Sequence, residues 1–208
     1  MTTVARAERH QLCDLALEVG ADAPTLCGDW DVKELVAHLL VRERSVLGAP
    51  GIIVPPLARL TDREIARTAR SNLKPLVARL RKGHSLLGLP VIDPLVNTLE
   101  YFVHHEDIRR AQPEWAPRAL DAHTSATLWR AITVTGRGLV RPAGVPVVIR
   151  DTDTGKTATL RRGSDPVTVS GKPGEIVMFL YGRRQTVGLE LTGPESSIKR
   201  LRDADLGI

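Results

Sequence analysis

The segment that most constrains the fold of this 208-residue chain is LEYFVHHEDIRR, residues 99–110. It gathers ionisable side chains in a stretch that predicts a helix. Residues four apart lie on one face of a helix, so Glu100 and His104 share a stripe, and Asp107 lies about a turn further along it. His105 points well away from this stripe. Any fold that buries this stripe must offset the free-energy cost of removing a carboxylate and an imidazole from water.

Two interpretations of the Glu100/His104 pair follow from the sequence. Pairs of Glu and His at this spacing are common as surface ion pairs. However, the stripe adjoins the apolar residues Val96, Leu99 and Val103, which turn the pair partly inward. A divalent metal would offset the cost of burying this pair if a third ligand came from elsewhere in the chain. Its ligand bonds would be about 2.0–2.2 Å long.

His38 is the candidate for that third ligand. It lies in an apolar helical segment around Leu35 and Leu39, where the alternative is a core histidine that makes one hydrogen bond. Four-helix bundles build metal sites from inward side chains on facing helices. Two His and one Glu are typical of catalytic zinc with an open position, and nickel, iron or cobalt also accept such ligands.

The hydrophobic periodicity predicts an α+β protein. Residues 1–114 are expected to form a four-helix bundle, with helices at 3–20, 31–47, 62–81 and from about 93 to before Pro113. Gly20 is a plausible stop, and Asp31 with Glu34 forms a capping box for the second helix. Pro75 should kink or split the third helix. Loops are expected at 48–57 and 83–90.

Residues 115–208 are expected to form a small α/β C-terminal domain. The elements predicted there are helices at about 118–138, 173–181 and 196–202, and strands at 145–150, 157–161, 166–170 and 185–191.

Composition narrows the class of partner. The net charge is +5, but the basic residues are scattered among acidic ones, which favours solvated helix faces or an anionic small substrate over nucleic acid. Cys13 and Cys27 fit no zinc-finger spacing and predict reduced thiols. The N-terminus lacks a signal peptide's apolar core, and no run approaches a membrane span. We therefore expect a cytoplasmic protein that does not bind membranes; its oligomeric state is not predicted.

Several other side chains have two interpretations each. Asp107 accepts a hydrogen bond from a ligand imidazole or from an arginine, or forms an ordinary salt bridge with Arg109 or Arg110. For His105 a structural contact is favoured over ligation. Cys27 is favoured as an apolar cysteine over a metal contact, and Trp30 as a packing residue.

The chain also resembles a known family. The residues that carry the resemblance are PTLCGDW at 24–30, then His38, then E-x-x-x-H-x-x-D-x-R at 100–109. This pattern is similar to the actinobacterial mycothiol-dependent maleylpyruvate isomerase-like proteins of the DinB-like superfamily. The resemblance spans nearly the whole chain and implies a DinB-like bundle joined to a small C-terminal domain. It also implies a divalent metal, often zinc, held by His38, Glu100 and His104.

The resemblance implies a function as well. In that family the thiol cofactor mycothiol adds to an activated double bond, allows rotation, and is expelled; related proteins transfer a thiol onto an electrophile. We therefore expect a metal-dependent transferase or isomerase that uses a small-molecule thiol and an electrophilic substrate. Arg183 lies where the isomerases present a substrate-facing arginine, although a cation that stabilises a helix C-terminus is an equal interpretation. The alternative function is a non-catalytic metal- or ligand-binding protein with a lipid-carrier-like C-terminal domain.

Overall fold

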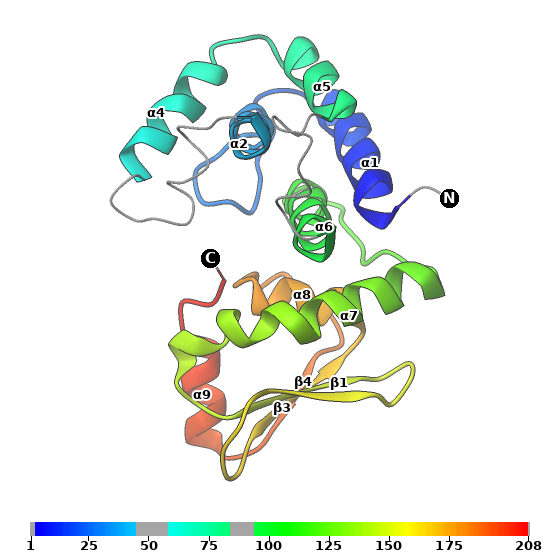
Figure 1. Cartoon of the computed structure of the whole chain (residues 1–208), viewed down its shortest axis with the longest axis vertical. Coiled ribbons are helices and arrows are strands. Elements are labelled where there is room, and N and C mark those ends of the chain that lie inside the picture. The colour runs from blue at the N-terminus through cyan, green and yellow to red at the C-terminus, as the bar shows by residue number, and fades with distance from the viewer. Residues whose placement is uncertain (1–2, 45–57, 84–93, 208) are drawn as a thin grey trace. The chain divides into compact units, whose positions relative to one another are not determined.

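The computed structural model describes residues 3–44, 58–83 and 94–207 of the chain (Figure 1). Its elements in chain order are α1 Val4–Val19, α2 Val32–Arg44, α4 Ala58–Thr68, α5 Leu73–Lys82, α6 Pro94–Arg110, α7 Ala122–Leu139, the 3₁₀ turn η2 Arg141–Ala143, β1 Val147–Asp151, β2 Thr157–Arg161, β3 Val167–Gly171, α8 Pro173–Leu180, β4 Glu190–Thr192 and α9 Glu195–Asp203. The α+β class predicted from the sequence is confirmed.

The chain divides into two compact units. The first comprises residues 1–94 and 104–116, and the second comprises 95–103 and 117–208, so the two parts of helix α6 are assigned to different units. The predicted domain boundary between residues 114 and 115 stays a prediction.

Helix α1 begins and ends close to the predicted residues, and helix α2 begins where the sequence predicts; the predicted end of the second helix at residue 47 lies outside the described residues. Helix α1 ends at Val19, and Gly20 follows with φ of 95°, a conformation that glycine adopts without strain. At the start of α2 the backbone N–H of Glu34 donates to the Asp31 carboxylate at 2.8 Å, and the N–H of Asp31 donates to the Glu34 carboxylate at 3.1 Å. This reciprocal pair is the predicted capping box, and it satisfies two amide groups that the helix leaves unbonded.

The predicted third helix is two helices, α4 and α5. The break falls at residues 69–72, and Asn72 precedes α5 as its N-cap residue. Pro75 is the third residue of α5, within the first turn, where a missing N–H costs no helical hydrogen bond. The loop predicted at 48–57 and nearly all of that at 83–90 lie outside the described residues.

The helices of the first unit pack through apolar stripes. Helix α5 packs against α1 and α2, and α2 also packs against α4. Leu76, Val77 and Leu80 give α5 a buried stripe, and full burial of one such side chain stabilises by about 1.5–3 kcal/mol. A smaller cluster joins Val41 of α2 to Ile65 of α4.

The second unit is built on a mixed sheet with strand order β2-β1-β3-β4. Strand β1 pairs antiparallel with β2 and parallel with β3, and β3 pairs antiparallel with β4. Helices α7 and α8 cover one face of the sheet (Figure 1). The sheet's core-facing residues alternate with less buried ones, as in β1, where Val147 and Ile149 are fully buried.

The last predicted strand is shorter than expected. The sequence predicts it over 185–191, but only Glu190–Thr192 pairs with β3. The backbone before Glu190 makes a different hydrogen bond: the N–H of Val187 donates to the Glu175 carboxylate at 3.0 Å. A side chain from α8 therefore takes a donor that a longer strand would have used.

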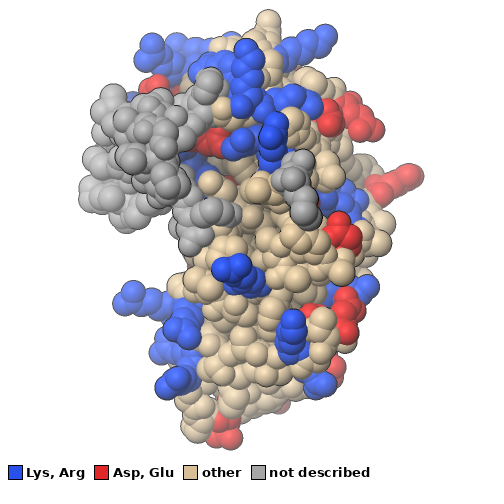
Figure 2. Space-filling view, turned by 45° about the vertical axis from the view of Figure 1, so that its right-hand side comes forward, with Lys and Arg blue, Asp and Glu red and all other residues tan. Residues whose placement is uncertain are grey.

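Charged side chains of both signs lie on one face of the molecule. On the face shown in Figure 2, Lys and Arg of the described residues are interspersed with Asp and Glu and separated by uncharged areas. Within the described residues, no helix has the length and apolar character needed to cross a membrane.

Candidate metal centre

A closed turn between α1 and α2 presents Cys27. The hydroxyl of Thr25 donates to the carbonyl of Trp30 at 2.7 Å and accepts from the N–H of Cys27 at 3.1 Å. Gly28, with φ of 60°, allows the backbone to reverse. The N–H of Leu26 donates to the carbonyl of Asp107 at 3.2 Å, which fixes the turn against α6.

Helix α2 carries His38 on its buried side. His38 is 9% exposed, and its ring lies 5.0 Å from that of Trp30 between centroids. Trp30 in turn packs against the apolar cluster of α2 and α4, as the sequence interpretation expected. On the other side the His38 ring lies 5.3 Å from that of His104, edge to face.

Helix α6 places Glu100 and His104 one turn apart. One donor atom from each of His38, Glu100 and His104 lies within 4.8 Å of the others. Both histidines are buried, and Glu100 is half-buried. The three residues named from the sequence are therefore brought together by the fold.

This donor set fits a divalent metal. Tetrahedral ligands at about 2.0–2.2 Å from zinc are about 3.4 Å apart, so small side-chain rotations would close the set around an ion. Nδ1 of His104 lies 2.9 Å from Oδ2 of Asp107, which leaves Nε2 as the ring nitrogen for a metal. A ligand histidine whose other nitrogen binds a carboxylate is the usual arrangement at protein metal sites.

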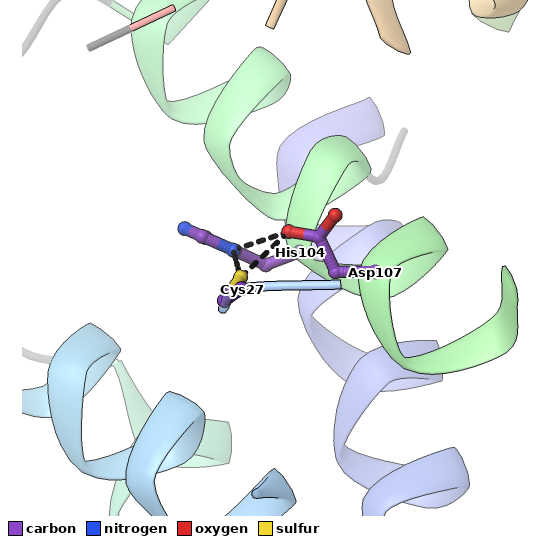
Figure 3. A group of neighbouring side chains, drawn as sticks. All are labelled: Cys27, His104 and Asp107. Carbon is purple, nitrogen blue, oxygen red and sulfur yellow. Dashed lines mark hydrogen bonds and ion pairs between the residues drawn. The ribbon is translucent and has the colours of Figure 1, made fainter. Parts of the chain in front are cut away.

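Cys27 joins the same cluster, contrary to its favoured interpretation as an apolar cysteine. Its Sγ lies 3.0 Å from Oδ2 of Asp107 and 3.5 Å from Nδ1 of His104 (Figure 3). Asp107 has no exposed surface. The motif PTLCGDW was a signal for this residue, but the pattern does not show that the turn docks on α6.

The remaining ionisable residues of α6 are also paired, and all of them except the partly exposed Arg109 are buried. Nδ1 of His105 lies 2.7 Å from Oε2 of Glu8 on α1, so His105 makes a structural contact. Glu106 accepts from Arg109 at 3.1 Å and from Arg110 at 2.6 Å. Because a buried charge is costly unless paired, this part of α6 can be enclosed despite its polar sequence.

Arg183 lies in the second unit, after α8. Its Nη1 donates to the carbonyl of Tyr181 at 2.5 Å, the contact that the helix C-terminus interpretation expects. The same residue, with Arg184 and Arg202, lines a cavity of about 260 Å³ whose other walls include Phe179 and Leu191. Arg183 thus makes a structural contact at the end of α8 and also lines a cavity.

Cys13 is chemically different from Cys27. Its side chain is fully buried, and its Sγ lies 3.9 Å from the carbonyl of Val77. Burial raises the pKa of the Cys13 thiol to about 11, because the thiolate would lose its hydration. Neither cysteine forms a disulfide.

Fold and cluster together define a protein with a helical N-terminal part, metal-type ligands on α2 and α6, and a small α/β C-terminal part. Residues 5–88 match the model of the mycothiol maleylpyruvate isomerase N-terminal domain. This match covers the N-terminal part of the chain and supports the family resemblance seen in the sequence.

Solved structures show the same fold over most of the chain. The crystal structure of a mycothiol-dependent maleylpyruvate isomerase matches with a TM-score of 0.60 and 19% identity, and that of its histidine-to-alanine mutant with a TM-score of 0.62 and 18% identity. Each match covers 91% of this chain and 90% of the other. No curated protein sequence matches the chain.

Proposed function

We propose that the protein is a divalent-metal-dependent enzyme that uses a small-molecule thiol, mycothiol, to isomerise or modify a small electrophilic substrate. The observation that carries the proposal is the convergence of donor atoms from His38, Glu100 and His104 within 4.8 Å. The family match supports mycothiol as the thiol, since both matched structures are of mycothiol-dependent enzymes.

His38, Glu100 and His104 would hold the ion, and three protein donors leave a position open for another molecule. Zinc is the metal that we propose first; nickel, iron and cobalt accept the same donors. A divalent ion bound there lowers the pKa of a coordinated thiol and so supplies a thiolate near neutral pH. Asp107 keeps the proton of His104 on Nδ1 and fixes the ring, so that Nε2 stays available.

We propose that Arg183 binds a carboxylate of the substrate or of another small molecule. The cavity that it lines combines guanidinium groups with apolar walls, which suits a small carboxylic acid. This cavity also supports the second candidate function, small-ligand binding without catalysis. Full ligand binding in Arg183→Gln would contradict the role of Arg183, and a titration of benzoate into both proteins measures it.

Elemental analysis of protein purified from its native host tests the metal site. We expect about one divalent ion per chain, and a lower affinity for zinc in His38→Ala and Glu100→Ala. Isomerisation and thiol-conjugation assays with mycothiol should then show activity in the wild type and none in these two variants.

His123→Ala is the matched control, because His123 is exposed on α7. It should keep both the metal and the activity. The proposal would be contradicted if the wild type were purified without metal and its unfolding temperature did not change when zinc or nickel was added.

A further inference from the structure

The thiol, imidazole and carboxylate of Cys27, His104 and Asp107 form a second set of metal-type donors. Their donor atoms lie 2.9 Å (Nδ1 to Oδ2), 3.0 Å (Sγ to Oδ2) and 3.5 Å (Sγ to Nδ1) apart. All three residues belong to the first unit. Figure 3 shows the three side chains pointing toward one another from α6 and from the turn before α2.

These separations are close to those around a tetrahedral ion. With bonds of about 2.3 Å to sulfur and about 2.0–2.2 Å to nitrogen or oxygen, tetrahedral donors lie about 3.4–3.6 Å apart. The Sγ–Nδ1 separation already has this value, and the other two need to widen by about 0.5 Å. The triad therefore needs only small side-chain movements to enclose an ion.

Burial gives this triad a reason to take a cation. Asp107 has no exposed surface, His104 is 9% exposed, and a carboxylate removed from water is costly unless its charge is compensated. A thiol is a weak hydrogen-bond donor. A soft divalent ion would replace the weak S–H bond with a metal–thiolate bond and would neutralise the carboxylate.

We propose that Cys27, His104 and Asp107 form a thiolate site for a soft divalent ion such as zinc or cobalt. When the ion binds, the Cys27 proton leaves to solvent, and the neutral imidazole of His104 carries its proton on Nε2. A neutral imidazole has only one nitrogen with a free lone pair. The triad and the set of His38 and Glu100 therefore exclude each other, and an ion in the triad withdraws His104 from the proposed active site. Only this last consequence rests on the proposed function.

Cobalt absorption spectroscopy tests the site. A thiolate ligand gives cobalt(II) a strong near-ultraviolet charge-transfer band that nitrogen and oxygen ligands lack. We expect the band when wild-type protein is titrated with cobalt, and its loss in Cys27→Ser. Glu100→Gln, which removes a donor only from the other set, should keep the band.

Cys13→Ala is the control, because Cys13 is the other thiol of the chain and it contacts Val77 rather than the triad. It should keep the band. Cobalt bound by the wild type without the band would overturn the inference and leave the proposed function standing. Loss of the band in Glu100→Gln would also overturn it, because Cys27 would then be a further ligand of one shared ion.

A measurement on wild-type protein covers the case in which Cys27→Ser does not fold. Alkylation of Cys27 by iodoacetamide, followed by peptide mass, should slow roughly ten-fold when zinc is about ten times its Kd, because only the metal-free fraction reacts. Glu100→Gln should show the same protection. An alkylation rate that zinc leaves unchanged would overturn the inference.

Discussion

Oδ2 of Asp107 lies 2.9 Å from Nδ1 of His104, one helical turn away on α6, and Asp107 is completely buried. The same oxygen lies 3.0 Å from Sγ of Cys27, which comes from a separate segment of the chain. One buried carboxylate thus orients both an imidazole and a thiol. The proposed active site depends on this carboxylate as well as on the residues that would touch the metal.

We predict that Asp107→Asn lowers the affinity for zinc by about 10–100-fold, because His104 loses the carboxylate that fixes its ring and its tautomer. Competition with a chromophoric chelator measures the affinity. Asp14→Asn is the control, since Asp14 is exposed and pairs with Arg81 on α5. An Asp107→Asn protein that binds zinc as tightly as the control would show that Asp107 does not support the ligand.

His105→Ala should destabilise the fold and leave the metal bound. The substitution removes the 2.7 Å contact between two buried groups, His105 and Glu8, and hydrogen bonds to charged groups contribute about 1.5–3 kcal/mol. Urea denaturation measures the free energy of unfolding, and elemental analysis measures the metal. Loss of the metal from folded His105→Ala would contradict a purely structural role.

The stability of the protein should fall with rising pH in a window set by Cys13. Burial raises the pKa of this thiol from 9.0 to about 11, so the unfolded chain loses this proton first as the pH rises. The contribution of the protonated Cys13 thiol to the free energy of unfolding is fully present below about pH 9. It is lost by about pH 11, a change of roughly 2–3 kcal/mol. The difference in unfolding free energy between wild type and Cys13→Ala isolates it from other groups that titrate there. A difference that is constant over this window would contradict the prediction.

Asp31→Ala should lower the unfolding free energy by about 0.5–2 kcal/mol, because it removes the N-cap of the helix that carries His38. Thermal and urea unfolding measure the loss. Asp29→Ala, an exposed aspartate before the cap, serves as the control and should change stability by less than about 0.5 kcal/mol. Equal losses in the two variants would argue against a capping role for Asp31.

Sequence by itself determined the local features of this protein. The capping box of Asp31 and Glu34, the end of α1 at Gly20 and the strand Thr157–Arg161 follow from residues close together in the chain. Such features depend on short-range hydrogen bonds and on hydrophobic periodicity, and both can be recognised from the order of the residues. The shared stripe of Glu100 and His104 has the same origin, because helix geometry alone sets it.

Only the tertiary structure decided which segments meet. Periodicity did not show that the turn with Cys27 docks on Asp107, nor that His105, on the other side of α6, faces the buried Glu8 of α1. These pairings join residues about 80 and 97 positions apart, and they form because burial forces each ionisable group of α6 to find a partner. A pattern within one helix says which side chains share a face, and packing decides what lies opposite.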